Sequence, residues 1–299
     1  MKAFKFLSNT ALVFSLVLLA SCSSDNDVEE TKTVAKKIEF KANIVMSDSS
    51  DVTRATLEDD YSVSWDANDA ISVYCDNKEQ SVEFDITPSS IDGTTATFTN
   101  YGEVLPAWFD PIDSYYAIYP HGAATFNPNT SMITSVMPTN QTVSANRTYD
   151  KKALFMTACA DATERVFNFL NIPALVKVTL SNNAAGKVKF IEIVSDSQAD
   201  NLSGNFRASA VYARNRINFE AISGAEKKHT VRLQITPSAE SQDFFIAVLP
   251  GTINGFTLKF EDGKYNALYE RVSDKKPVLK SSKIYNFGSY DVEDMLAVK

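Results

Sequence analysis

Apolar and polar residues alternate in many short segments of this chain. In the segment IEFKANIV (38–45), Ile38, Phe40, Ala42 and Ile44 occupy every second position, so an extended strand would have one apolar face. The same pattern recurs at 61–65, 71–75, 82–86, 115–119, 175–180, 188–193, 230–235, 244–249 and 256–260. No stretch shows a convincing helical face of three turns. Short alternating segments of this kind predict an all-β protein built from antiparallel β-sandwiches.

Turn-forming residues separate these segments, for example at Asp92-Gly93 and Asp262-Gly263. The whole chain has 299 residues, which is long for a single sandwich of about 100 residues. We therefore predict two sandwich domains, at 38–164 and 165–299. The second would begin just before the strand series that Phe167-Asn168-Phe169 opens.

Residues 1–21 have the features of a signal peptide. Lys2 and Lys5 precede an apolar run that is shorter than the roughly 20 residues needed to cross a bilayer. The run ends in LASC, which resembles a bacterial lipobox and predicts that Cys22 becomes the lipidated N-terminus. Residues 22–37 begin with a polar, acidic stretch and are predicted to tether the domains to the membrane.

Composition argues against most enzyme and nucleic-acid functions. The formal net charge of −8 would repel phosphate backbones, so we expect no nucleic-acid partner. With 2 histidines and 3 cysteines in the whole chain, soft ligands are scarce, and we expect no metal and no cofactor. His121 lies in a Pro-His-Gly turn and His229 in a polar hairpin signal, and no G-x-S-x-G elbow is present. We therefore predict that the protein is not an enzyme.

Cys75 and Cys159 both lie in strand-like segments of a chain that we expect to be exported. An even pair of cysteines in an oxidising compartment can form a disulfide. Two free, buried thiols are an equally good interpretation, and the sequence leaves both open.

Two further features have a structural and a functional interpretation. Trp65 ends an alternating segment and is predicted to pack in the core, whereas Trp108 lies in LPAWFDP (105–111), a loop that could contact a ligand. Asp66-Ala67-Asn68-Asp69 begins like a calcium loop but lacks the required glycine and closing glutamate. A turn between strands is the favoured interpretation of that tetrapeptide.

Several segments together resemble the fimbrillin-like proteins of Bacteroidetes, the subunits of type V pili. Each segment is a strand plus a turn, and their order and spacing carry the resemblance over nearly the whole chain. The acidic stretch after Cys22 also resembles the surface-export signals of Bacteroidetes lipoproteins. Besides the lipobox, the segments are TRAT (53–56), YSVSWDANDAISVY (61–74), FNFLNIPALVKVTLSN (167–182), FFIAVLPGTINGFTLKFEDGK (244–264) and KIYNFG (283–288).

The resemblance implies two domains of transthyretin-like (Greek-key) topology in a lipoprotein precursor of the outer membrane. At the cell surface the protein would be a structural subunit of a fimbrium that supports adhesion and biofilm formation. An arginine-specific protease would cut after Arg54 and release the strand 38–46. The open groove would then accept a strand from another fimbrial subunit, and a host or bacterial surface could supply a further ligand.

Three points stay open at this stage. The first is whether the strand 38–46 is released or retained, since a subunit that anchors the fimbrium would retain it. Residues 289–299 alternate only weakly, which favours a tip or accessory subunit over a stalk subunit that must donate a strand. The alternative function is a surface-exposed glycan-binding lipoprotein that does not polymerise.

Overall fold

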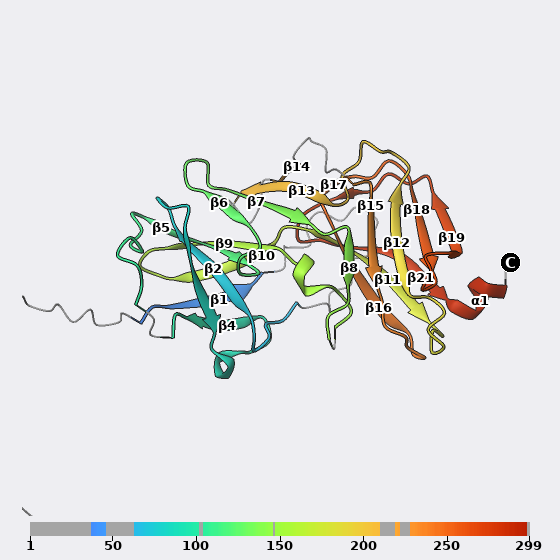
Figure 1. Ribbon diagram of the computed structural model, residues 1–299, viewed down its shortest axis with the longest axis horizontal. Coiled ribbons are helices and arrows are strands. Elements are labelled where there is room, and N and C mark those ends of the chain that lie inside the picture. The colour runs from blue at the N-terminus through green and yellow to red at the C-terminus, as the bar shows by residue number, and fades with distance from the viewer. Residues whose placement is uncertain are drawn as a thin grey trace, which may run out of the picture. The chain divides into compact units, whose positions relative to one another are not determined.

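The computed structural model describes residues 37–45, 63–101, 104–145, 147–209, 219–221 and 228–297. Residues 35–299 form one compact unit. Strands dominate the described residues, which confirms the all-β prediction (Figure 1). The unit contains two hydrophobic cores, and the first also takes in residues from the second half of the chain, such as Phe206, Phe245 and Ile284.

Among the described strands, seven close into a barrel around the first core, in the order β1-β10-β9-β5-β2-β3-β4. The strands are β1 (Glu39–Ile44), β2 (Ala70–Cys75), β3 (Ser81–Ile86), β4 (Thr95–Thr99), β5 (Ser114–Tyr119), β9 (Met156–Asp161) and β10 (Val166–Asn171). We expected an antiparallel β-sandwich here. The ring is closed because β1 pairs with β4 on one side and with β10 on the other.

The strand β10 lies just after the domain boundary predicted at 164/165. It pairs with β1 and β9 in the barrel. Phe167 and Phe169 on β10 are fully buried in the first core. Alternation shows that this segment is a strand, but it carries no information about which distant strand will pair with it.

The second core lies between two sheets with the strand orders β19-β18-β12-β15-β8 and β16-β11-β21. Two short strands, β17 (Gly251–Thr252) and β20 (Val278–Leu279), form a separate two-stranded antiparallel sheet. The longer strands are β11 (Ala174–Ser181), β12 (Phe190–Ser195), β15 (Thr230–Gln234), β16 (Gln242–Val248), β18 (Phe256–Glu261), β19 (Ala267–Ser273) and β21 (Ile284–Asp291).

Strands from the two halves of the chain also pair with each other, as Figure 1 shows for β7 with β13 and for β8 with β15. The Gln141 side chain on β8 adds to this seam. It donates to the carbonyl of Ala247 at 2.7 Å and accepts from the N–H of the same residue at 3.0 Å. The strands concerned are β6 (Thr125–Asn127), β7 (Met132–Met137), β8 (Asn140–Thr142), β13 (Gly204–Ser209) and β14 (Phe219–Ala221).

Two local predictions also differ from the structure. Val63 and Trp65 are buried, but the described residues 63–66 form no strand. After β21, a short helix α1 (Val292–Ala297) follows where we considered a weak strand. Its Val292 and Met295 belong to the second core, so packing rather than a long helical repeat holds this turn. The remaining elements are the short 3₁₀ turns η1 (Pro88–Ser90) and η2 (Lys151–Ala153).

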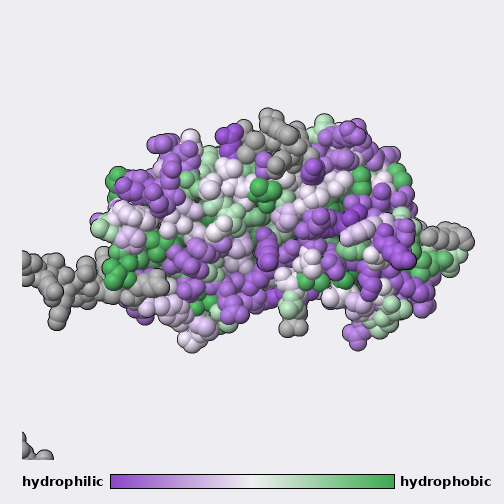
Figure 2. Space-filling view, viewed as in Figure 1, coloured by the Kyte–Doolittle hydropathy of each residue, from purple (hydrophilic) through white to green (hydrophobic). Residues whose placement is uncertain are grey.

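Hydrophilic residues cover most of the face drawn in Figure 2, with hydrophobic residues in smaller groups between them. Large apolar side chains that stay exposed include Val104, Ile112 and Val272. None of the helices among the described residues combines the length and the apolar character needed to span a membrane.

Candidate functional site: the seat of the first strand

β1 is hydrogen-bonded along both edges. It runs antiparallel to β4, with Phe40 opposite Phe98 and Ala42 opposite Ala96, and parallel to β10, with Ala42 opposite Phe167. A strand with ladders on both sides is an interior strand of the barrel. We call the position between β4 and β10, with the side-chain pockets beneath it, the strand seat.

Three alternating apolar residues of β1, together with Ile38 just before it, fill this seat. Ile38, Phe40, Ala42 and Ile44 are 1%, 0%, 0% and 6% exposed, which confirms their predicted inward face. Aromatic rings surround Phe40 most closely. Its ring centroid lies 5.0 Å from Phe84, 4.9 Å from Tyr115 and 4.7 Å from Phe167.

Polar contacts mark the outer face of β1 and the residue just before it. The Asn43 side chain donates to the Asn168 side chain at 2.9 Å on the outer face of the barrel. Just before the strand, the N–H of Ile38 donates to Oδ1 of Asn100 at 3.1 Å. The strand is therefore amphipathic in the way that a half-buried ladder requires.

Trp65 lies at the Ile44 end of the seat. The carbonyl of Thr94 accepts from the N–H of Ile44 and from the indole N–H of Trp65, each at 2.9 Å. The backbone N–H of Trp65 donates to the carbonyl of Gly93 at 3.1 Å. The indole ring also lies 5.4 Å from Phe169, which is the partner of Ile44 on β10. Trp65 is 3% exposed, which confirms that it packs in the core.

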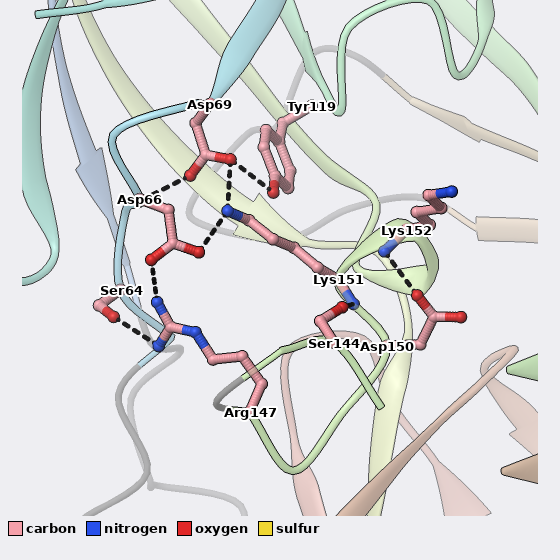
Figure 3. A network of polar contacts seen from close by, with 9 residues as sticks. All are labelled: Ser64, Asp66, Asp69, Tyr119, Ser144, Arg147, Asp150, Lys151 and Lys152. Carbon is pink, nitrogen blue, oxygen red and sulfur yellow. Dashed lines mark hydrogen bonds and ion pairs between the residues drawn. The ribbon is translucent and has the colours of Figure 1, made fainter. Parts of the chain in front are cut away.

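A charged cluster follows directly in the sequence, and we name Asp66, Asp69, Arg147 and Lys151 the polar clasp (Figure 3). Lys151 pairs with both carboxylates, at 2.7 Å from Asp69 Oδ1, and Arg147 pairs with Asp66. The N–H of Asp66 donates to Asp69 Oδ2 at 2.8 Å, so residues 66–69 form the turn that the sequence favoured. Arg147 also donates to the Ser64 hydroxyl at 3.0 Å.

The charges of the clasp are matched. Burial by itself would raise the pKa of Asp66, but Lys151 and Arg147 outweigh burial and lower it. The Tyr119 hydroxyl donates to Asp69 at 3.1 Å, and burial together with the nearby Asp69 charge raises the pKa of this tyrosine strongly. The Asp66 carboxylate therefore stays ionised near neutral pH, and the tyrosine stays a hydrogen-bond donor.

Comparisons with known proteins find similarity only among solved structures. No protein-family model matches the chain, and no curated protein matches it. A "putative cell adhesion protein" of Bacteroides ovatus aligns with 86% of this chain and 92% of its own, at 18% identity and a TM-score of 0.49. A protein of the same description from Bacteroides uniformis aligns with 85% of this chain and 94% of its own, at 15% identity and a TM-score of 0.47.

The tip fimbrial protein Mfa3 of Porphyromonas gingivalis, with a C-terminal truncation, is also similar. The alignment covers 85% of this chain and 94% of that protein, at 9% identity and a TM-score of 0.36.

The predicted lipidation site Cys22 and the predicted cleavage point Arg54 lie outside the described residues, and both stay predictions. Cys75 and Cys159 are free thiols. Cys75 lies on β2 opposite Tyr115 of β5, whereas Cys159 lies on β9 opposite Tyr116 of β5. They are therefore two strands apart, about 9.5 Å, and on opposite faces of the barrel wall, a separation that no disulfide spans. Of the two alternatives, the structure has the free thiols.

One polar contact was missed from the sequence. His121 Nδ1 lies 3.0 Å from the Ser72 hydroxyl, and its Nε2 lies 3.4 Å from Glu83. Ser72 is 1% exposed and already accepts from the N–H of Gly122, so this Ser-His-Glu order offers no nucleophile to a substrate. These residues meet through pairing of β2 with β3 and β5, which local sequence spacing does not reveal.

The described residues contain no group of three or more His, Cys, Asp or Glu side chains that could hold a metal ion. Trp108, in the loop that we considered for ligand contact, is half-buried against the first core. Its ring centroid lies 6.0 Å from that of Phe109, which is itself buried.

Proposed function

We propose that this chain is a structural subunit of a cell-surface fimbrium that assembles by strand exchange. The observation that carries the proposal is that β1 completes a barrel, while its covalent connection to the strands that follow runs through residues 46–62. Arg54 is the single Lys or Arg in that segment. A cut after Arg54 would leave β1 bound by non-covalent contacts alone.

Loss of β1 would leave one gap in the barrel, with a free strand edge on each side. The inward edges of β4 and β10 would lose their hydrogen-bond partners, and the pockets of the seat would meet water. Burial of Ile38, Phe40 and Ile44 stabilises the barrel by about 5–9 kcal/mol at about 1.5–3 kcal/mol for each large apolar side chain. A strand from another subunit would restore both the ladders and the burial, so cleavage should drive association.

The backbone of the seat accepts a strand in either direction. β4 is antiparallel to β1 and β10 is parallel to it, so β4 and β10 run opposite to each other. Any strand placed between them makes one antiparallel and one parallel ladder. Side-chain fit, rather than backbone pairing, must therefore choose the orientation of the partner strand.

We place this subunit at the tip of the fimbrium or in an accessory position. Support comes from the C-terminal residues that we considered as a donor strand: β21 already pairs with β11, and residues 292–297 are helical. The precursor would be held at the outer membrane through lipid on Cys22. A host or bacterial surface ligand belongs to this proposal as the target of adhesion.

The test is limited digestion of the purified chain with trypsin, compared with the Arg54→Ala variant. We expect the wild type to release a fragment containing residues 38–46 and to form ladders of oligomers on unheated gels. The Arg54→Ala chain should stay intact in this segment and monomeric. Oligomers of equal size in both proteins, or a cut wild type that stays monomeric, would contradict the proposal.

The alternative is a surface lipoprotein that binds glycans without polymerising. Flat aromatic rings exposed to solvent are the feature it requires. Trp65 cannot serve because it is buried, but Tyr265 is 58% exposed and lies 4.9 Å from Phe190 on the outer face of the second half. Glycan-array binding that is lost in Tyr265→Ala, by a chain that stays monomeric after cleavage, would favour this alternative.

A further inference from the structure

Trp65 ends the strand seat at the Ile44 end. Its backbone N–H occupies the carbonyl of Gly93, and its indole N–H shares the carbonyl of Thr94 with Ile44. These two carbonyls come just before β4, at the end of its ladder with β1. The ladder between β1 and β4 ends at Ile44, because the backbone N–H and carbonyl of Asp92, which would take the next position, are both bonded to Thr95. Trp65 lies against this end of the ladder.

The polar clasp fixes the residues on either side of this tryptophan. Ser64 and Asp66 are both held by Arg147, and Lys151 holds Asp66 and Asp69. Asp69 is 5% exposed, so its pairing with Lys151 is screened far less by water than that of a surface ion pair.

The cationic side of the clasp comes from a segment that is itself anchored to the second half. Tyr149, between the two cationic residues, forms a bridge with Phe245 of β16, and the N–H of Phe245 donates to the carbonyl of Thr148 at 2.9 Å. Lys151 begins the turn η2, capped by the Asp150 side chain. None of these contacts involves β1, so the clasp has no need of β1 to stay in place.

We propose that the polar clasp holds Trp65 as the fixed end of the strand seat, so that the seat keeps its shape when β1 leaves. The last apolar residue of an incoming strand then packs against Trp65 in the place of Ile44. The partner is an extended segment with four apolar residues at alternate positions, the third of them small because Ala42 lies between Ala96 and Phe167. This inference rests on the proposed strand exchange.

The first experiment uses the uncut chain and is independent of strand exchange. Trp108→Phe leaves Trp65 as the only tryptophan of the two in the chain. In that background, Lys151→Met removes the cation that pairs with both carboxylates of the clasp. Lys152→Met is the matched control, because Lys152 is exposed and its ammonium group points away from the clasp in Figure 3. Acrylamide quenching of Trp65 and deuterium uptake by residues 63–69 should rise severalfold in Lys151→Met and stay unchanged in Lys152→Met.

The second experiment measures binding of a synthetic peptide of residues 38–46 to each chain after cleavage and removal of β1. Lys151→Met should bind the peptide at least about tenfold more weakly than wild type, which corresponds to about 1.4 kcal/mol. Lys152→Met should bind as the wild type does. Arg147→Gln, which keeps Lys151 in place, is the milder variant if Lys151→Met does not fold.

Each outcome decides one of the two ideas. Equal shielding of Trp65 in all variants would overturn the clasp. An exposed Trp65 with unchanged peptide affinity would overturn its role in strand binding. If β1 cannot be removed from the cut wild type, the proposed strand exchange fails and the seat loses its role as an acceptor, while the first experiment still shows whether the clasp holds Trp65.

Discussion

Phe40 should contribute more to the attachment of β1 than any other side chain of that strand. The ring is 0% exposed and its centroid lies within 5.0 Å of the rings of Phe84, Tyr115 and Phe167. Phe40→Ala removes this ring from a closed barrel in which β1 is paired on both sides and cannot move inward. We therefore expect the free energy of unfolding to fall by about 3–5 kcal/mol, the usual cost of a buried Phe→Ala change.

Urea unfolding followed by tryptophan fluorescence measures this loss. Both tryptophans report on the barrel, since Trp65 belongs to the first core and Trp108 packs against it. Lys41→Ala is the matched control because Lys41 is the next residue of β1 and is exposed. Its free energy of unfolding should stay within about 0.5 kcal/mol of wild type, as expected for a surface change.

The same substitution should act more visibly after cleavage. At 1.4 kcal/mol for each factor of ten, the loss predicts that a peptide of residues 38–46 carrying Phe40→Ala binds the emptied seat about a hundredfold to a few thousandfold more weakly. A peptide carrying Lys41→Ala should bind almost as wild type. If the two substitutions had equal effects in both assays, burial of Phe40 could not be what holds β1 in the barrel.

Three further outcomes are expected. Metabolic labelling with palmitate should mark the wild type and not Cys22→Ala, and label that persists in the variant would contradict lipidation at this residue. Burial and nearby carboxylates raise the pKa of the Cys75 thiol to about 12, and burial also raises the pKa of the Cys159 thiol. A thiol reagent at pH 8 should therefore modify both cysteines only after unfolding. A shift in gel mobility on reduction would instead reveal a disulfide. Burial opposes ionisation of Asp200, but hydrogen bonds from neighbouring hydroxyls and from Asn254 outweigh it and lower its pKa below 3.8. Its stabilisation is therefore full above pH 3.8 and lost as the pH falls through the folded value, so the stability gap between wild type and Asp200→Asn should be constant near pH 7 and close on acidification.

Alternation in the sequence was enough to find β1 and its inward face. The period of two between apolar residues is a local property, because successive side chains of a strand point to opposite faces whatever the partner strand is. For the same reason Trp65 could be placed in the core, whereas the turn at 66–69 was favoured because that tetrapeptide lacks the glycine and the closing glutamate of a calcium loop. Burial at Val63 and Trp65 without a strand shows the limit of this argument, since an irregular segment can bury alternate residues as well.

Pairing across long sequence separations was decided only by the tertiary structure. β1 closes the barrel against β10, about 125 residues later, and Asp66 meets Arg147 81 residues later. Backbone donors and acceptors are the same at every residue, so the ladders themselves do not specify which strands meet. That choice depends on how the side chains of both cores pack against one another. It determined the closed barrel, the position of β10, the free cysteines and the polar clasp. A local pattern of apolar and polar residues encodes none of these features.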